Sequence, residues 1–156
     1  PHPDAQVRAG SAQLVEVMTP LVKGWGTEVA MESTSLGVQV HGGMGFIEET
    51  GAAQHMRDAR ILPIYEGTNG IQAMDLVGRK LSIDNGKHWR ALHDEISNFT
   101  EKLPDTIEFA VIKKNLSKIT ARSKESAGWL LSQHNESKTN AMAGSVPYVR
   151  MLSTSV

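Results

Sequence analysis

The chain has 156 residues and a formal net charge of −1, with 16 Lys and Arg against 17 Asp and Glu. It is about one domain long, and the balanced charge argues against a nucleic-acid partner. The absence of cysteine excludes disulfides, a thiolate nucleophile and cysteine-ligated metals. No apolar run reaches the ~20 residues of a membrane span. The chain begins without Met, and we expect it to be a piece of a longer protein.

The first predicted helix starts at Thr19-Pro20, because Thr can cap a helix and Pro is tolerated at its first position. Apolar residues at helical spacing then predict one continuous helical face. These residues are Val22, Trp25, Val29, Leu36 and Val40. Gly42 to Gly45 ends this helix.

Two shorter helices are predicted next. Thr50 is the expected cap of a helix that runs to about Ile61 and stops at Pro63. Another helix begins near Asn69, where Gln72 stands three residues further on, as in a capping box. It runs to about Leu81, and the polar, Gly-containing residues 82–86 form a linker.

Beyond this linker the sequence predicts three more helices. The first is marked by Trp89, Leu92, Ile96, Phe99 and Leu103, and the second by Ile112, Leu116, Ile119, Ala127 and Leu130. Pro104-Asp105 is a turn between them, and the polar residues 132–139 are a loop. The last helix covers 141–156, with Tyr148, Val149, Met151 and Leu152 as apolar anchors.

Strand patterns are scarce, so the prediction is an all-α chain of about six helices. A helical bundle over residues 1–82 is followed by a second small helical unit over residues 83–156.

The Gly-rich block GGMG at 42–45 has two interpretations. Its spacing differs from the dinucleotide fingerprint, and it follows a helix rather than a strand. The residues alone favour a helix C-cap with a tight turn. The alternative is a place where backbone amides approach a phosphate or an adenine closely. The six histidines do not stand at metal-ligand spacings, so no metal site is predicted.

Glu66 stands alone between the apolar run 61–65 and the turn residues 67–70. One interpretation is a carboxylate near a helix start, where the helix dipole favours it. The other is a general base beside an apolar pocket, which removes a proton from a substrate. Spacing does not separate these two interpretations.

Two blocks of residues resemble the C-terminal helical domain of the acyl-CoA dehydrogenases. One is Gln-x-x-Gly-Gly-x-Gly-aromatic, from Gln39 to Phe46, and the other is Arg-Asp-x-Arg followed by Ile-Tyr-Glu-Gly-Thr, from Arg57 to Thr68. Their order and separation are those of the family. Residues 83–156 resemble, more loosely, an extra helical region carried by one bacterial-type branch of the family.

The resemblance implies an FAD enzyme that oxidises an acyl-CoA to its trans-2-enoyl-CoA. Glu66 matches the base that removes the α-proton, and its backbone N–H matches a donor to the thioester oxygen. Gly67 matches a position next to the substrate. Residues matching positions that contact FAD are Thr68, Asn69 and Gly70, and Gly70 departs from the Gln or Glu common there. Residues matching a segment that reaches the FAD of a neighbouring subunit are Gln39, Val40, His41, Gly42 and Gly43.

The resemblance further implies electron transfer to an electron-transfer flavoprotein, a homo-oligomer, and a bacterial cytoplasmic enzyme, with the mitochondrial matrix as the alternative location. The family's N-terminal helical domain and middle β-domain are not in this sequence. We therefore expect the isolated chain to hold no FAD and to be inactive. The alternatives are a catalytically silent binding or assembly module of the same family, and a plain helical bundle.

Overall fold

The computed structural model describes residues 2–156, which form helices joined by short connections, with no strand among them. The all-α prediction is confirmed. The α-helices are α1 (Ala5–Val40), α2 (Gly43–Phe46), α3 (Ala52–Ile61), α4 (Asn69–Gly78), α5 (Lys87–Lys102), α6 (Ile107–Glu136), α7 (Lys138–Ala143) and α8 (Ser145–Ser153). Two 3-10 segments, η1 (Glu48–Thr50) and η2 (Lys80–Gly86), connect them.

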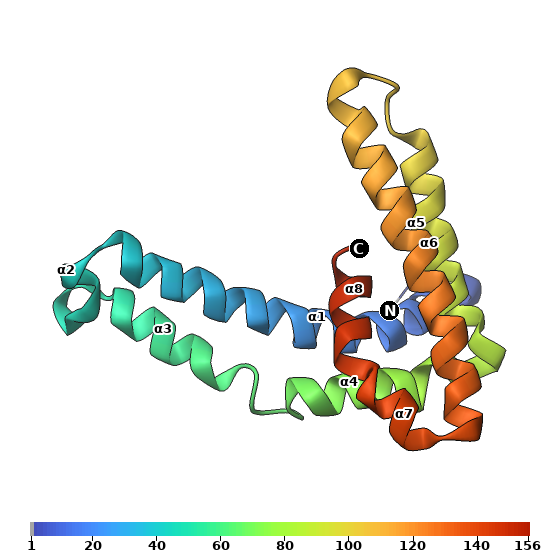
Figure 1. Cartoon of the computed structure of the whole chain (residues 1–156), viewed down its shortest axis with the longest axis horizontal. Helices are drawn as coiled ribbons and strands as arrows, with labels where there is room; N and C mark the ends of the chain where they lie inside the picture. The colour runs from blue at the N-terminus through green and yellow to red at the C-terminus, as the bar shows by residue number, and fades with distance from the viewer. Residues whose placement is uncertain (1) are drawn as a thin grey trace.

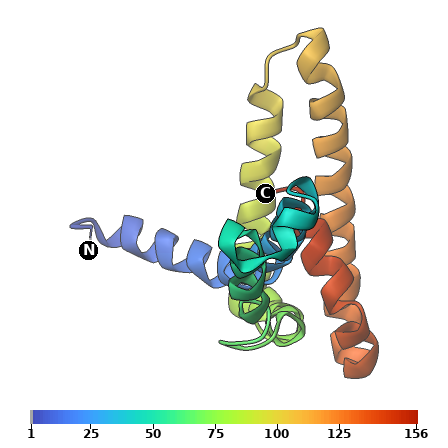
Figure 2. The ribbon, with the colours of Figure 1, turned by 90° about the vertical axis from the view of Figure 1, so that its left-hand side faces the viewer.

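Two arms meet at a corner (Figure 1). One arm consists of the C-terminal half of α1 with α2 and α3, and the other is the hairpin of α5 and α6. Helices α4, α7 and α8 pack between them at the corner. The first turns of α1 project away from the corner, as Figure 2 shows.

The hydrophobic core lies at this corner and draws on both halves of the chain. Its buried members are Val17, Leu21, Ala73, Leu76, Val77, Leu81, Trp89, Leu92, Ile96, Ala127, Leu130, Ala141, Tyr148, Val149 and Leu152. Residues before and after position 82 therefore share one cluster. The division into units 1–82 and 83–156 stays a prediction.

Helix α1 begins at Ala5, not at Thr19-Pro20, so the predicted helix start is wrong. The cap is Asp4, whose carboxylate accepts hydrogen bonds from the first-turn N–H groups. Pro20 lies inside the helix and lacks the N–H for one helical hydrogen bond. Because Val17, Pro20 and Leu21 are buried together, packing keeps the chain helical across this proline.

The predicted apolar face of α1 does not form the core. Val22, Val29, Leu36 and Val40 are exposed, and Val40 keeps 84% of its surface. Helices α4 and α8 pack instead on the face that carries Val17, Leu21 and Gly24. Most of the predicted stripe is thus left uncovered in this chain.

The predicted loop over 132–139 is also wrong. Helix α6 continues to Glu136 and α7 starts at Lys138, with only Ser137 between them. The polar residues there form the outer surface of helices, since Leu130 and Ala141 are buried on the inner side. The predicted last helix is interrupted at Gly144, where a Cβ atom would lie 2.8 Å from Leu130 Cδ2.

Several other apolar predictions are confirmed, but Ile112 of the predicted α6 face is 51% exposed. Buried residues include Trp89, Leu92 and Ile96 of α5 and Tyr148, Val149 and Leu152 of α8. Phe99 was expected on the same α5 face, but it is 59% exposed because the upper part of the α5–α6 hairpin extends beyond the core.

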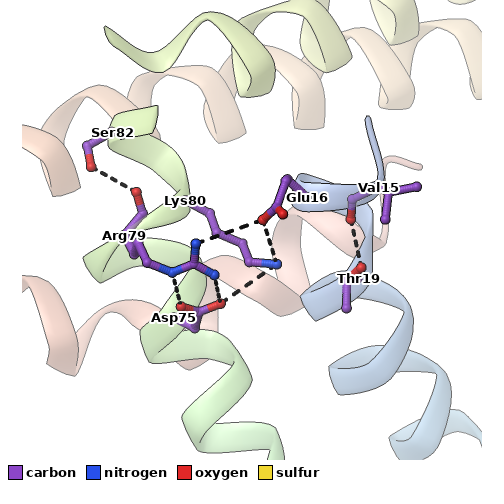
Figure 3. A network of polar contacts seen from close by, with 7 residues as sticks. All are labelled: Val15, Glu16, Thr19, Asp75, Arg79, Lys80 and Ser82. Atoms are coloured by element: carbon purple, nitrogen blue, oxygen red, sulfur yellow. Dashed lines mark hydrogen bonds and ion pairs between the residues drawn. The ribbon is translucent and has the colours of Figure 1, made fainter. Parts of the chain in front are cut away.

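A network of charged groups ties α4 and η2 to α1 (Figure 3). Lys80 is buried, and its Nζ lies 3.4 Å from Glu16 Oε2 and 3.7 Å from Asp75 Oδ2. Arg79 donates to both carboxylate oxygens of Asp75, at 2.7 and 3.0 Å. These hydrogen bonds from Arg79 hold the pKa of Asp75 below its usual range. The two anions compensate the burial of the Lys80 cation, which would otherwise be costly.

His93 is fully buried between α5 and α6. Its Nδ1 lies 2.7 Å from the Trp89 carbonyl oxygen, and its Nε2 lies 2.9 Å from Ser123 Oγ. Because a carbonyl can only accept, Nδ1 carries the hydrogen and Nε2 accepts from the Ser123 hydroxyl in the neutral ring. Burial lowers the pKa of His93, so this neutral form is favoured.

We therefore expect His93 to make stability depend on pH. Its pKa is lower in the folded than in the unfolded state, so the unfolded state takes up the proton first. The contribution to stability is complete above the ordinary imidazole pKa of about 6.5 and is lost as the pH falls below it. Urea unfolding at pH 7.5 and 5.5 measures this loss. It should shrink in His93→Gln and persist in the control His55→Gln, which changes an exposed histidine.

Candidate active site

Glu66 and Gly67 lie in the turn between α3 and α4, and both have left-handed backbone conformations. Their φ angles are 56° and 80°. Glycine adopts this conformation freely, but for a glutamate it is uncommon and costs free energy. Such residues gather at functional sites, where the surrounding structure holds them.

Hydrogen bonds close this turn. The Asn69 N–H donates to the Pro63 carbonyl at 3.2 Å, and Gln72 Nε2 donates to the Glu66 carbonyl at 2.9 Å. Thr68 is the N-cap of α4, with its Oγ1 accepting from the Ile71 N–H at 3.3 Å. The predicted helix start is thus correct within one residue. The capping box is wrong, because Gln72 reaches the Glu66 carbonyl.

The first turn of α4 presents hydrogen-bond donors next to Glu66. The Gly70 N–H has no acceptor among residues 2–156, as expected for the first turn of a helix. The Thr68 hydroxyl accepts from the backbone and keeps its own hydrogen for another partner. The Asn69 side chain differs, because it is hydrogen-bonded to α1. This donor set suits an oxygen-rich ligand such as a phosphate or a flavin.

The second predicted cofactor segment, residues 39–43, lies elsewhere. It is exposed at the end of α1, and His41 Nδ1 lies 2.9 Å from the Gly37 carbonyl oxygen. Asn69 contacts α1 near Thr27, and Gln39 is roughly 18 Å further along that helix at 1.5 Å per residue. One chain therefore does not bring residues 39–43 and 68–70 together (Figure 1).

The glycines of the GGMG block have different roles. Gly42 follows the last residues of α1 with a φ of 59° and a ψ of −143°, a combination that glycine adopts far more readily than other residues. A Cβ on Gly45 would lie 2.3 Å from the Val38 carbonyl oxygen, so only glycine fits there. A Cβ on Gly43 would meet nothing within 4 Å. Gly42 and Gly45 are thus required for the turn. Gly43 is not, because a side chain there would meet no neighbouring atom of this chain.

Two further kinds of site are absent from the part of the chain that the structure describes. No helix within residues 2–156 is long and apolar enough to cross a membrane. Over the same residues, no three His, Asp or Glu side chains are grouped so that they could hold a metal ion.

Comparison with known proteins identifies the family of this chain. The family model for the C-terminal domain of acyl-CoA dehydrogenase matches residues 5–81. The chain is 45% identical to 3-methylmercaptopropionyl-CoA dehydrogenase of Ruegeria pomeroyi over 151 residues, which are 96% of this chain and 26% of that protein. The chain belongs to the acyl-CoA dehydrogenase family.

Other relatives are acyl-CoA dehydrogenases as well. A butyryl-CoA dehydrogenase of Syntrophomonas wolfei is 34% identical, over 72% of this chain and 19% of that protein. The broad-specificity linear acyl-CoA dehydrogenase FadE5 of Mycobacterium tuberculosis is 30% identical, over 78% of this chain and 20% of that protein. The chain thus spans about a quarter or less of the length of these relatives.

Substitutions in the GGMG block should separate folding from binding. Gly45→Ala should lower the free energy of unfolding by about 2 kcal/mol, because the new methyl group collides with the Val38 carbonyl. Gly43→Val should leave the helical content of the chain nearly unchanged and reduce FAD retention in the whole enzyme. Urea unfolding and flavin absorbance measure the two effects. Equal stability of Gly45→Ala and wild type would contradict the packing assigned here.

Proposed function

We propose that this chain supplies the catalytic base of an FAD-dependent acyl-CoA dehydrogenase, which oxidises an acyl-CoA to its trans-2-enoyl-CoA. One observation carries the proposal. Tyr65-Glu66-Gly67-Thr68 is intact, and Glu66 sits in a left-handed conformation inside a turn closed by hydrogen bonds. A non-glycine residue in that conformation is uncommon, and such residues gather at functional sites.

Glu66 acts on the acyl group in two ways. Its carboxylate takes the α-proton as general base. Its backbone N–H has no acceptor among residues 2–156, so it can donate to the thioester oxygen as negative charge develops there. Gly67 carries no side chain, so the substrate can lie against the backbone. FAD, when bound, accepts the β-hydride.

The residues present fit a flavin cofactor at the start of α4. Thr68 and Gly70 offer a hydroxyl and a backbone N–H, whereas the backbone N–H and the side chain of Asn69 are already hydrogen-bonded within the chain. Residues 39–43 are too far along α1 to join them within one chain, which supports a contact with the FAD of a neighbouring subunit. The active enzyme is therefore a homo-oligomer.

The remaining assignments follow the relatives. Their names indicate straight-chain and sulfur-containing acyl-CoA substrates, so butyryl-CoA and 3-methylmercaptopropionyl-CoA are the first probes for this enzyme. An electron-transfer flavoprotein is the proposed electron acceptor. Bacterial relatives favour a bacterial cytoplasmic enzyme. Because the relatives are roughly four times as long, these assignments concern the whole protein that carries this chain.

The base is tested by Glu66→Gln in the whole protein. The amide has nearly the same shape but cannot accept the α-proton, so bound FAD should be retained while turnover falls ~10²–10⁴-fold. Dye-linked assays with both acyl-CoA probes and the flavin absorbance give these two quantities. The matched control Glu101→Gln changes an exposed glutamate of α5 and should keep full turnover. Full turnover in Glu66→Gln would contradict the proposal and show that another residue is the base.

The isolated chain should be colourless and self-associated. It offers few of the contacts that hold FAD, and each ~1.4 kcal/mol of lost binding free energy weakens affinity tenfold. Phe46, Ile64 and Tyr65 are 80%, 48% and 46% exposed, as expected from the sequence, and bared apolar surface favours association. A flavin absorbance scan and light scattering measure both properties. Stoichiometric FAD would contradict the first expectation, and a monomeric mass the second.

A further inference from the structure

We infer that Asn69 is a positioning residue for Glu66, and that its side chain fixes the catalytic turn to α1. The inference rests on the proposed function of Glu66 as base. The sequence places Asn69 among residues that contact FAD. The structure instead shows its side chain engaged inside the molecule, between the start of α4 and the middle of α1.

The Asn69 amide contacts three residues of α1. Its Nδ2 donates to the Gly24 carbonyl at 3.0 Å, and its Oδ1 accepts from Lys23 Nζ at 3.2 Å. The Thr27 hydroxyl lies 3.1 Å from the same Oδ1 and 2.7 Å from the Lys23 carbonyl, so its single proton serves one of the two. All three contacts are at least partly buried.

The chemistry of these partners fixes the orientation of the amide. Lys23 Nζ can only donate, and the Gly24 carbonyl can only accept. The amide oxygen must therefore face Lys23, and the amide nitrogen must face Gly24. Neither Asp nor Leu at position 69 could satisfy both partners, because Asp lacks the donor and Leu lacks both groups.

Asn69 acts on Glu66 through a short path. Its backbone N–H closes the loop onto the Pro63 carbonyl, and Glu66 stands inside this loop. Gln72, on the same helix, holds the Glu66 carbonyl. The loop is thus closed on itself. The Asn69 side chain supplies the hydrogen bonds that connect this loop to α1. Without those bonds, the closed loop can shift as a unit relative to the rest of the site.

The α1 partner of Asn69 is itself held from the other side. A Cβ on Gly24 would lie 3.4 Å from Val149 Cγ1, so α8 packs directly on this part of α1. One turn further along, Arg150 donates to Glu28 at 3.0 Å. Gly24, Asn69 and Val149 also line one small cavity of about 50 Å³. The Asn69 contact is therefore made to a segment that cannot easily move.

A positioning role predicts a distinct kinetic pattern. A displacement of about 1 Å at a reacting group can cost ~10²-fold in rate. Loss of the Asn69 side chain should therefore slow α-proton removal, with little change in acyl-CoA binding. A residue that only contacts FAD would change the flavin content instead.

The test compares Asn69→Ala with wild type in the FAD-loaded whole protein. The probe is butyryl-CoA or 3-methylmercaptopropionyl-CoA, whichever wild type turns over faster. We expect kcat per bound flavin to fall 10–100-fold, KM to change less than about threefold, and the isotope effect with α-deuterated probe to rise. Hydrogen exchange of the peptide 63–72 should become faster, independently of activity. The control Asn140→Ala changes an exposed asparagine of α7 and should alter none of these readouts.

Lys23→Met is the milder second variant, since it removes the ammonium group that donates to Asn69 Oδ1 and keeps most of the side-chain volume. It should change kcat and the isotope effect in the same direction, by a smaller factor, and it decides the matter if Asn69→Ala does not fold. Loss of flavin with unchanged kcat per flavin would overturn the inference and assign Asn69 to the cofactor. Unchanged kcat per flavin together with unchanged hydrogen exchange of the peptide 63–72 in Asn69→Ala would overturn the inference as well. Glu66→Gln, measured in parallel, tests the proposed base separately.

Discussion

The packing of α4 on α1 fixes where the candidate active site lies. Leu76 of α4 shares the buried cluster with Val17 of α1. At the C-terminal end of this contact Lys80 pairs with carboxylates, and at the N-terminal end Asn69 is hydrogen-bonded to α1. Since the turn with Glu66 leads directly into α4, the placement of α4 sets the placement of Glu66.

Helix α4 could not hold this position alone. It has 10 residues, and isolated helices of this length are marginal in water. Its stability must come from the buried Ala73, Leu76 and Val77, which pack with α1, α7 and α8. Tertiary contacts of α4 therefore hold the Glu66 turn in place on the fold, while local hydrogen bonds from Asn69 and Gln72 close the turn itself.

The same packing leaves one face of α1 uncovered. Val22, Leu36 and Val40 are exposed, although their spacing is that of a buried helical face. A continuous apolar stripe of this kind marks a surface that normally contacts other protein. It supports the proposal that this chain works as one part of a longer, oligomeric enzyme. The sequence pattern identified this apolar face correctly, but the face does not belong to the core of this chain.

Sequence reasoning succeeded where the information is local. The turn at Glu66 and the buried face of α5 follow from residue types and spacings within a few positions. It failed at Pro20 and at residues 132–139, where tertiary packing keeps the chain helical against local preference. The hydrogen bonds of Asn69 could not be predicted, because its partners lie 42 to 46 residues away. The family resemblance did not help there, since it matched Asn69 to a cofactor position.

The region after residue 82 packs directly against the two helices that hold the candidate site, α1 and α4. Val149 contacts α1 at the residue that accepts from Asn69, and Arg150 pairs with Glu28 one turn away. Tyr148 and Leu152 are buried in the cluster that includes Leu76 of α4. Because buried cores transmit small displacements, α8 contributes to the position of Glu66 without touching it. The helices after residue 82 therefore stabilise the geometry of the turn that carries Glu66, in addition to extending the fold.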